Sequence, residues 1–183
     1  MAVPGSSYAA RRAARATLAQ ADLLAPGARH LRKAFGALSR IGLPTYSSAA
    51  GQSILRGAYR REVTNSALTF TDGSGLEWPV RKFFEIPALG SALLCIPCNG
   101  FEALGFRDGD SAIATTPEAV VDDARRFLAD PDHLRSIQQA GWRVVQSSHT
   151  VEARAPAFRS ALQKVIAGTF SGSWWVQGRI TVR

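Results

Sequence analysis

Apolar and polar residues alternate in blocks along the middle of the chain, and these blocks predict a repeating order of strands and helices. Residues 53–63 predict a helix, and residues 67–71 (Ala-Leu-Thr-Phe-Thr) are typical of a short strand. The continuous apolar run of residues 91–96 predicts a strand buried on both faces, and residues 111–115 predict another strand. Because strand–helix–strand units build parallel sheets through right-handed crossovers, we expect a Rossmann-like α/β unit over about 66–130.

The second half of the chain carries strong signals for the start and end of helices. Residues 116–118 (Thr-Pro-Glu) place a capping hydroxyl, a proline and an acid where a helix begins, and Asp130-Pro131 ends it. Apolar side chains at helical spacing predict two more helices, around 134–145 and 151–166. Pro156 must kink the last helix or mark its true beginning.

The two ends of the chain are less regular. Residues 7–21 predict a helix with Ser6 or Ser7 as its N-cap, and a short helix can form around residues 30–38. We expect one Rossmann-like domain over residues 1–170, with its first 50 residues poorly organised, followed by a tail over 171–183. The tail contains Trp174-Trp175 and a potential strand at 178–182, and we expect it to pack against something, since exposed tryptophan pairs are unusual.

Composition indicates a soluble globular protein. Of the 183 residues 46% are hydrophobic and 20% are charged, which suits one sizeable core. No apolar run reaches the roughly 20 residues that a membrane-spanning helix requires. The amino terminus also lacks the basic and apolar regions of a secretory signal, so we expect a cytoplasmic protein.

The net charge of +8 is concentrated at the amino-terminal end. Residues 1–65 contain ten Lys and Arg against two acids, Asp22 and Glu62, whereas residues 66–183 are electrically balanced. This excess could attract phosphate, either in nucleic acid or in a nucleotide. We favour a solvated helix face or a surface for an acidic neighbour, because no continuous basic run is present and aromatic residues are almost absent there. Binding to nucleic acid is therefore not expected.

Residues 77–90 form the segment richest in candidate chemistry. Pro79 suits the first turn of a helix that we expect to run to about Leu89, with Gly90 as its C-cap. Glu77 then lies at the edge of a loop and Glu85 about two turns into the helix. A carboxylate in such a place can accept hydrogen bonds from two hydroxyls of a ribose.

Two basic residues in the same segment suit the other end of a nucleotide. Arg81 and Lys82 would lie in the first helical turn, beside free backbone N–H groups, where they could bind a diphosphate. Chance competes with this interpretation, because the chain contains six glutamates and some pair would reach this spacing in about one sequence in six.

Cys95-Ile-Pro-Cys98 has the spacing of a redox dithiol or of half a zinc site. No helix is expected after it, and His30, His133 and His149 have no spacing that would complete a metal site. We therefore favour a core position for Cys95 and an incidental thiol in a loop for Cys98, with no metal bound. His149 could be a catalytic base, but a structural role beside Thr150 as a helix N-cap is the favoured alternative.

Residues 78–115 resemble the donor-binding half of GT-B-type glycosyltransferases. More narrowly, the sequence Arg-Lys-Phe-Phe-Glu-Ile-Pro-Ala-Leu-Gly and the later Leu-Gly-Phe-Arg-Asp-Gly-Asp are similar to the "glycosyl transferases group 1" domain of spore-maturation-like bacterial proteins. The likeness covers about 59–160. Such a domain is a single Rossmann-like half of a GT-B enzyme, in agreement with the fold expected from the pattern.

The resemblance implies a role for several residues. Glu85 would bind the ribose of a nucleotide diphosphate sugar, and Glu77 would lie near the donor sugar or its phosphates as the candidate catalytic residue. Asn99 and Gly100 would border the nucleotide. The match at Glu77 is the less secure of the two glutamates, because members of the narrower group do not always keep it.

These relatives transfer sugar without a required metal, so no cofactor is expected beyond the nucleotide sugar, which is the donor substrate. GT-B enzymes place their active site between two Rossmann domains, and a chain of this length has room for one. We therefore expect a glycosyltransferase domain, or a fragment of such an enzyme, that needs an N-terminal domain or a protein partner. The alternative is a non-catalytic Rossmann-like module that uses its basic N-terminal half to bind nucleic acid or a protein.

Overall fold

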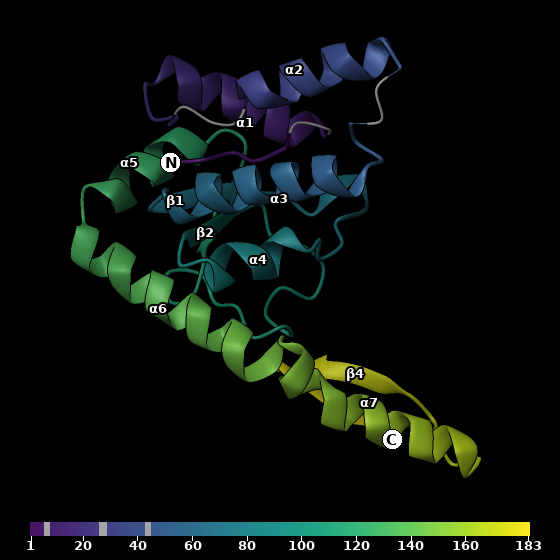
Figure 1. Ribbon diagram of the computed structural model, residues 1–183. Coiled ribbons are helices and arrows are strands. Elements are labelled where there is room, and N and C mark those ends of the chain that lie inside the picture. Colours follow the sequence, from purple (N-terminus) through teal and green to yellow (C-terminus); the bar gives the residue numbers. More distant parts are fainter. Residues whose placement is uncertain (6–7, 26–28, 43–44) are drawn as a thin grey trace.

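The computed structural model, which describes residues 1–5, 8–25, 29–42 and 45–183, has a parallel sheet at its centre (Figure 1). Its strands are β1 (Leu68–Thr71), β2 (Ala92–Cys95) and β3 (Ile113–Ala114), and they lie side by side in that order. Helices flank the sheet, so the structure confirms the expected Rossmann-like α/β fold.

The amino terminus adds a strand-like segment to the sheet beside β1. The backbone N–H of Ala2 donates to Leu68 O at 2.9 Å, and that of Phe70 donates to Ala2 O at the same distance. A strand position therefore precedes α1 (Ala9–Gln20). The N-caps expected for this helix, Ser6 and Ser7, lie outside the described residues. Tyr8 occupies the cap position and makes no capping hydrogen bond with its side chain.

Side chains of the sheet alternate between two hydrophobic clusters. On β2, Ala92 and Leu94 belong to a cluster that also contains residues of α1 and α5 (Val120–Leu128). Leu93 and Cys95 belong to the second cluster, on the opposite face, with residues of α4 (Lys82–Ala88). This double burial is the reason that the strand is apolar at every position.

Among the described residues, three helices begin at hydroxyl or carboxylate caps. Ser48 Oγ accepts from Gly51 N at 3.1 Å, so α3 (Ala49–Thr64) starts about one turn before the predicted residue 53. Asp130 caps α6 (Pro131–Ser148), and Thr150 caps α7 (Val151–Ile166). Pro156 lies inside α7 and does not mark its beginning.

Residues 116–119 form a turn ahead of α5, and Thr116 Oγ1 accepts from Ala119 N at 3.2 Å in that turn. The expected start signal is therefore present, but it closes a turn that comes before the helix. The short helix expected around 30–38 is present as α2 (Arg29–Arg40). None of the helices in the described ranges combines the length and the apolarity that crossing a bilayer requires.

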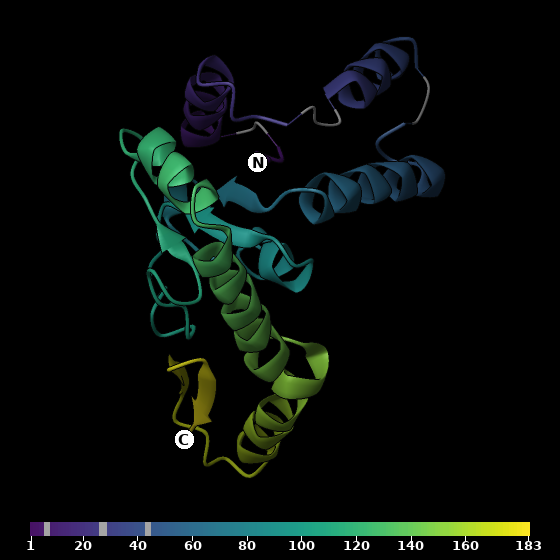
Figure 2. The ribbon, with the colours of Figure 1, turned by 90° about the vertical axis from the view of Figure 1, so that its left-hand side faces the viewer.

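The carboxyl-terminal part extends away from the sheet at the end opposite α1 and α2 (Figure 2). It consists of α7 and an antiparallel hairpin of β4 (Ser173–Val176) and β5 (Arg179–Val182). Trp175 packs on the second cluster and over the guanidinium of Arg154, with 4.9 Å between the guanidinium carbon and the ring centre. The tail therefore packs on the rest of the protein, as predicted.

Candidate functional site

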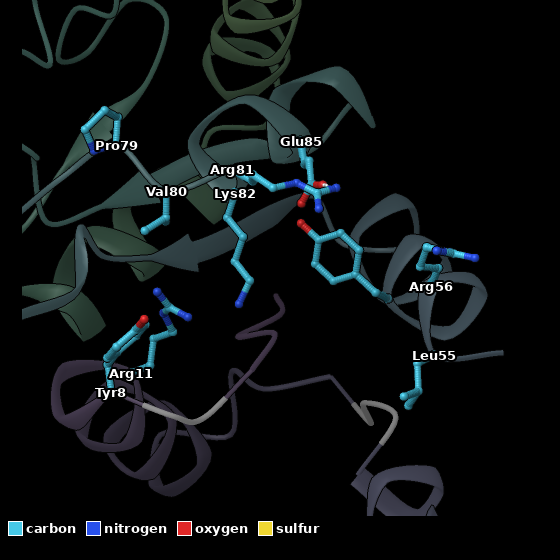
Figure 3. A pocket seen from close by; sticks show the side chains of 10 residues that line it. Tyr8, Arg11, Leu55, Arg56, Pro79, Val80, Arg81, Lys82 and Glu85 are labelled. Atoms are coloured by element: carbon cyan, nitrogen blue, oxygen red, sulfur yellow. Dashed lines mark hydrogen bonds and ion pairs between the residues drawn. The ribbon is translucent and has the colours of Figure 1, made fainter. Parts of the chain in front are cut away.

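A groove of about 730 Å³ opens at the carboxyl end of β1 (Figure 3). Its walls come from three segments: the start of α1, the middle of α3, and the chain that leads into α4. Parallel sheets bind ligands at this end of their strands, so the groove lies where such a fold places a ligand. Its lining side chains are Tyr8, Arg11, Leu55, Arg56, Tyr59, Pro79, Val80, Arg81, Lys82 and Glu85.

One wall is fixed by a buried ion pair. Arg11 Nε donates to Asp72 Oδ1 at 2.5 Å, and Arg11 Nη2 also donates to Asp72 O at 3.3 Å. Only 5% and 6% of the two side chains are exposed, so water screens the pair little. Asp72 directly follows β1, and the pair therefore holds α1 against the end of that strand.

The second wall is the segment that contains the candidate residues, and it differs from the expectation in one respect. The helix begins at Lys82 and has seven residues, so Pro79 precedes it and Glu85 lies in its first turn, not two turns along. The reason is local: the first bonds of this turn run from Phe83 N to Val80 O and from Glu85 N to Arg81 O. The C-cap is Leu89, one residue before the predicted Gly90, and Gly90 follows it with a φ of +84°.

The candidate residues of this wall lie together in the groove and already have partners. Arg81 Nη2 is 2.5 Å from Glu85 Oε1, with 89% of the arginine and 31% of the glutamate side chain exposed. Lys82 Nζ donates to Pro4 O at 2.6 Å, which ties the start of α4 to the amino-terminal strand segment. Lys82 and Arg11 point toward one another across the groove in Figure 3.

The third wall contributes Tyr59, which the sequence did not single out. Burial is the main cause that raises the pKa of this phenol, and the negative charge of the nearby Glu85 carboxylate raises it further. The hydroxyl oxygen is buried, and it makes no well-aligned hydrogen bond to any residue that the structure describes. Its contact with Glu85 is therefore a loose one. The only hint in the sequence is the position of Tyr59 on one face of a helix, which does not reveal a neighbour 26 residues away.

Glu77, Asn99 and Gly100 are not among the side chains that line the groove. Glu77 has a φ of +54° and an exposed side chain, in the loop after β1. Asn99 N donates to Glu77 O at 2.7 Å, so the loops after β1 and β2 are joined. The structure thus brings these three residues close to one another, but not into the groove with Glu85.

Both cysteines are buried, free and part of the second cluster. The position of Cys95 in the core is as predicted. Cys98 was expected to be an incidental loop thiol, but only 5% of it is exposed, because it packs beneath the turn at Gly73. Burial raises the pKa of both thiols. Among the residues that the structure describes, no three His, Cys, Asp or Glu side chains gather as metal ligands would.

His149 has the structural role that was favoured for it. Its Nε2 lies 2.7 Å from Leu104 O, and Arg154 Nη2 lies 2.8 Å from its Nδ1. A carbonyl can only accept and a guanidinium can only donate, so the ring is neutral with its proton on Nε2. Burial, and to a smaller extent the charge of Arg154, lower the pKa of His149 despite the bond to Leu104 O.

Comparison with known families identifies most of this region. Residues 45–160 match the family model described as "Glycosyl transferase-like". No curated protein and no solved structure matches the chain. The match includes α3, the sheet and α4 with Glu85, and it extends over more than half of the 183 residues. The chain therefore belongs to the glycosyl transferase-like family.

Proposed function

We propose that this chain is the donor-binding domain of a GT-B-type glycosyltransferase of the spore-maturation-like group, and that the groove binds a nucleotide diphosphate sugar. The observation that carries the proposal is the position of Glu85. Its carboxylate lies in a groove at the carboxyl end of the sheet, among basic side chains, within the part of the chain that matches the family.

Glu85 binds the ribose in this proposal. Its carboxylate has two oxygens that can accept hydrogen bonds from neighbouring hydroxyls, and 31% of the side chain is exposed to an incoming ligand. The pair with Arg81 does not prevent this, because an exposed ion pair contributes little stability and can be exchanged for ligand contacts.

The basic side chains of the groove bind the diphosphate. Arg81 is paired with Glu85, and Lys82 begins the same helical turn, whereas Arg11 across the groove is already neutralised by Asp72. Arg81 and Lys82 are therefore the cations meant here. Transfer of the sugar leaves a nucleoside diphosphate, and cations placed beside it stabilise the charge that develops on this leaving group. These cations would take the place of a metal, so we propose that no metal is required.

Glu77 is the proposed catalytic residue near the donor sugar, and Asn99 with Gly100 borders the nucleotide. The bond between Asn99 N and Glu77 O supports a common place for them, at the end of the sheet beside the groove. We propose that an N-terminal GT-B domain or a protein partner supplies the acceptor side, which makes transfer depend on both.

Nucleotide binding by the isolated chain tests the proposal. Saturating UDP or GDP should raise the melting temperature, because a ligand at 100 times its Kd stabilises the folded state by about 2.7 kcal/mol. The shift should disappear in Glu85→Gln and persist in Glu118→Gln, which changes an exposed glutamate that does not line the groove. If no nucleotide shifts the wild-type protein, the proposal is wrong. Salt-dependent binding of DNA or RNA in its place would favour the nucleic-acid module.

A further inference from the structure

The ring of Tyr59 is held in place by the interior of the protein. Tyr59 is half-buried and packs against the second cluster, to which Val63 of the same helix and Phe83 of α4 also belong. Two helices therefore fix the direction in which its hydroxyl points. The residue lines the groove, and its hydroxyl oxygen is buried.

A phenol is protonated near neutral pH. Burial and the nearby Glu85 carboxylate both raise the pKa of Tyr59 further. A protonated phenol is a hydrogen-bond donor, and a carboxylate accepts from it more strongly than a neutral group does. The Tyr59 hydroxyl makes no well-aligned hydrogen bond to any described residue. Its proton is therefore available to strengthen the contact with Glu85.

The other neighbour of Glu85 is held far less firmly. Arg81 is 89% exposed, so its guanidinium can leave the carboxylate at little energetic cost. Tyr59 and Arg81 both lie close to the Glu85 carboxylate, and of the two only Tyr59 is held in position by packing. A carboxylate that must accept two hydroxyls at once needs such a fixed support, because misplacement weakens both bonds together.

We propose that Tyr59 is a positioning residue, which holds the Glu85 carboxylate in the orientation that receives the 2′ and 3′ hydroxyls of a ribose. This inference rests on the proposed function and extends it to sugar selectivity. A 2′-deoxynucleotide offers one hydroxyl fewer, and the oriented carboxylate is then left with one oxygen unpaired. Selection of ribose over deoxyribose therefore depends on Tyr59, which acts through Glu85.

Calorimetric titration with UDP and 2′-deoxyUDP, or with the corresponding guanine pair if it binds more tightly, tests this inference. Wild-type protein should prefer the ribonucleotide. Tyr59→Phe should weaken ribonucleotide binding on the order of 10-fold, which is the size expected for a hydrogen bond to a charged group. Its affinity for the deoxynucleotide should change by less than about 3-fold, so that the preference falls.

Tyr46→Phe is the matched control. It removes the same atom from a tyrosine that packs edge-on against Phe35, with 5.9 Å between ring centres, and that does not line the groove. It should keep the wild-type preference. Thermal melting of both variants separates loss of selectivity from loss of folding.

Each result has a distinct meaning. If the wild-type protein prefers the ribonucleotide and Tyr59→Phe retains that preference, the positioning role is wrong and the proposed function stands. If the wild-type protein binds no nucleotide, the proposed function is wrong. The contact between Tyr59 and Glu85 can then still be tested without a ligand, by a pH titration of the tyrosines followed by ultraviolet absorbance. Glu85→Gln should lower the pKa of one tyrosine. An unchanged tyrosine titration would show that Tyr59 and Glu85 do not interact.

Discussion

Arg11 and Asp72 are 61 residues apart in the chain, yet their side chains form an ion pair that is more than nine-tenths buried. The pair joins the start of α1 to the residue that follows β1 and forms part of the groove wall. Removal of one charge leaves the other buried without a partner.

We therefore expect Asp72→Asn to lower the free energy of unfolding by about 3–5 kcal/mol. Denaturant unfolding followed by circular dichroism measures this change. Asp132→Asn is the control, because it breaks a pair with Arg135 whose side chains are 63% and 89% exposed, and it should have little effect. Equal effects of the two variants would show that burial does not decide the strength of the Arg11–Asp72 pair.

Two glycines in helices should respond to alanine in opposite directions. A Cβ on Gly141 of α6 would lie 2.6 Å from Ser111 O, a backbone atom that cannot move aside cheaply. Gly141→Ala should lower stability by about 1–3 kcal/mol. A Cβ on Gly57 of α3 meets nothing within 4 Å, so Gly57→Ala should raise stability by up to about 1 kcal/mol through helix propensity. Melting temperatures of the two variants check both signs.

Both thiols should react slowly in the folded protein. Burial raises the pKa of Cys95 and of Cys98, which lowers the fraction of reactive thiolate at any given pH. Labelling with a chromogenic disulfide at pH 8 should be slow in buffer and fast in denaturant. One rapidly reacting thiol in buffer would contradict the buried position found for Cys98.

His149 should make the protein less stable in mild acid. Its pKa is lowered on folding, so between the folded and unfolded values the unfolded chain binds more protons, and stability falls as pH decreases through that window. Protonation at Nδ1 also breaks the bond from Arg154. The melting temperature should therefore fall between pH 7.5 and 5.5, and the fall should be smaller in His149→Gln. An unchanged slope in this variant would assign the pH dependence to other groups.

The sequence predicts the central sheet well because its signals are local. The apolar run at 91–96 and the strand at 67–71 each contain the information for one element, and their parallel pairing follows from the helices between them. The family resemblance is supported over residues 45–160, at the level of a glycosyl transferase-like domain. The part played by Glu85 stays a prediction.

The errors arise where distant residues decide the outcome. Arg11 meets Asp72, and Tyr59 meets Glu85, only after helices pack on the sheet, so spacing along the chain contains no sign of either contact. Cys98 lies just after a strand and resembles a loop residue, but the turn at Gly73 covers it. The position of Glu85 was missed by a turn because Pro79 and Val80 come before the helix and not within it.

The aromatic rings around His149 connect the carboxyl-terminal hairpin to a helix that lines the groove. His149 lies between Trp175 of the hairpin and Phe84 of α4, with ring centres 5.0 Å and 4.6 Å away. Phe84 directly precedes Glu85 in α4. The three rings therefore form a series of contacts from the carboxyl-terminal hairpin to the residue before Glu85. The carboxyl-terminal hairpin is therefore linked through packed side chains to the helix that presents Glu85.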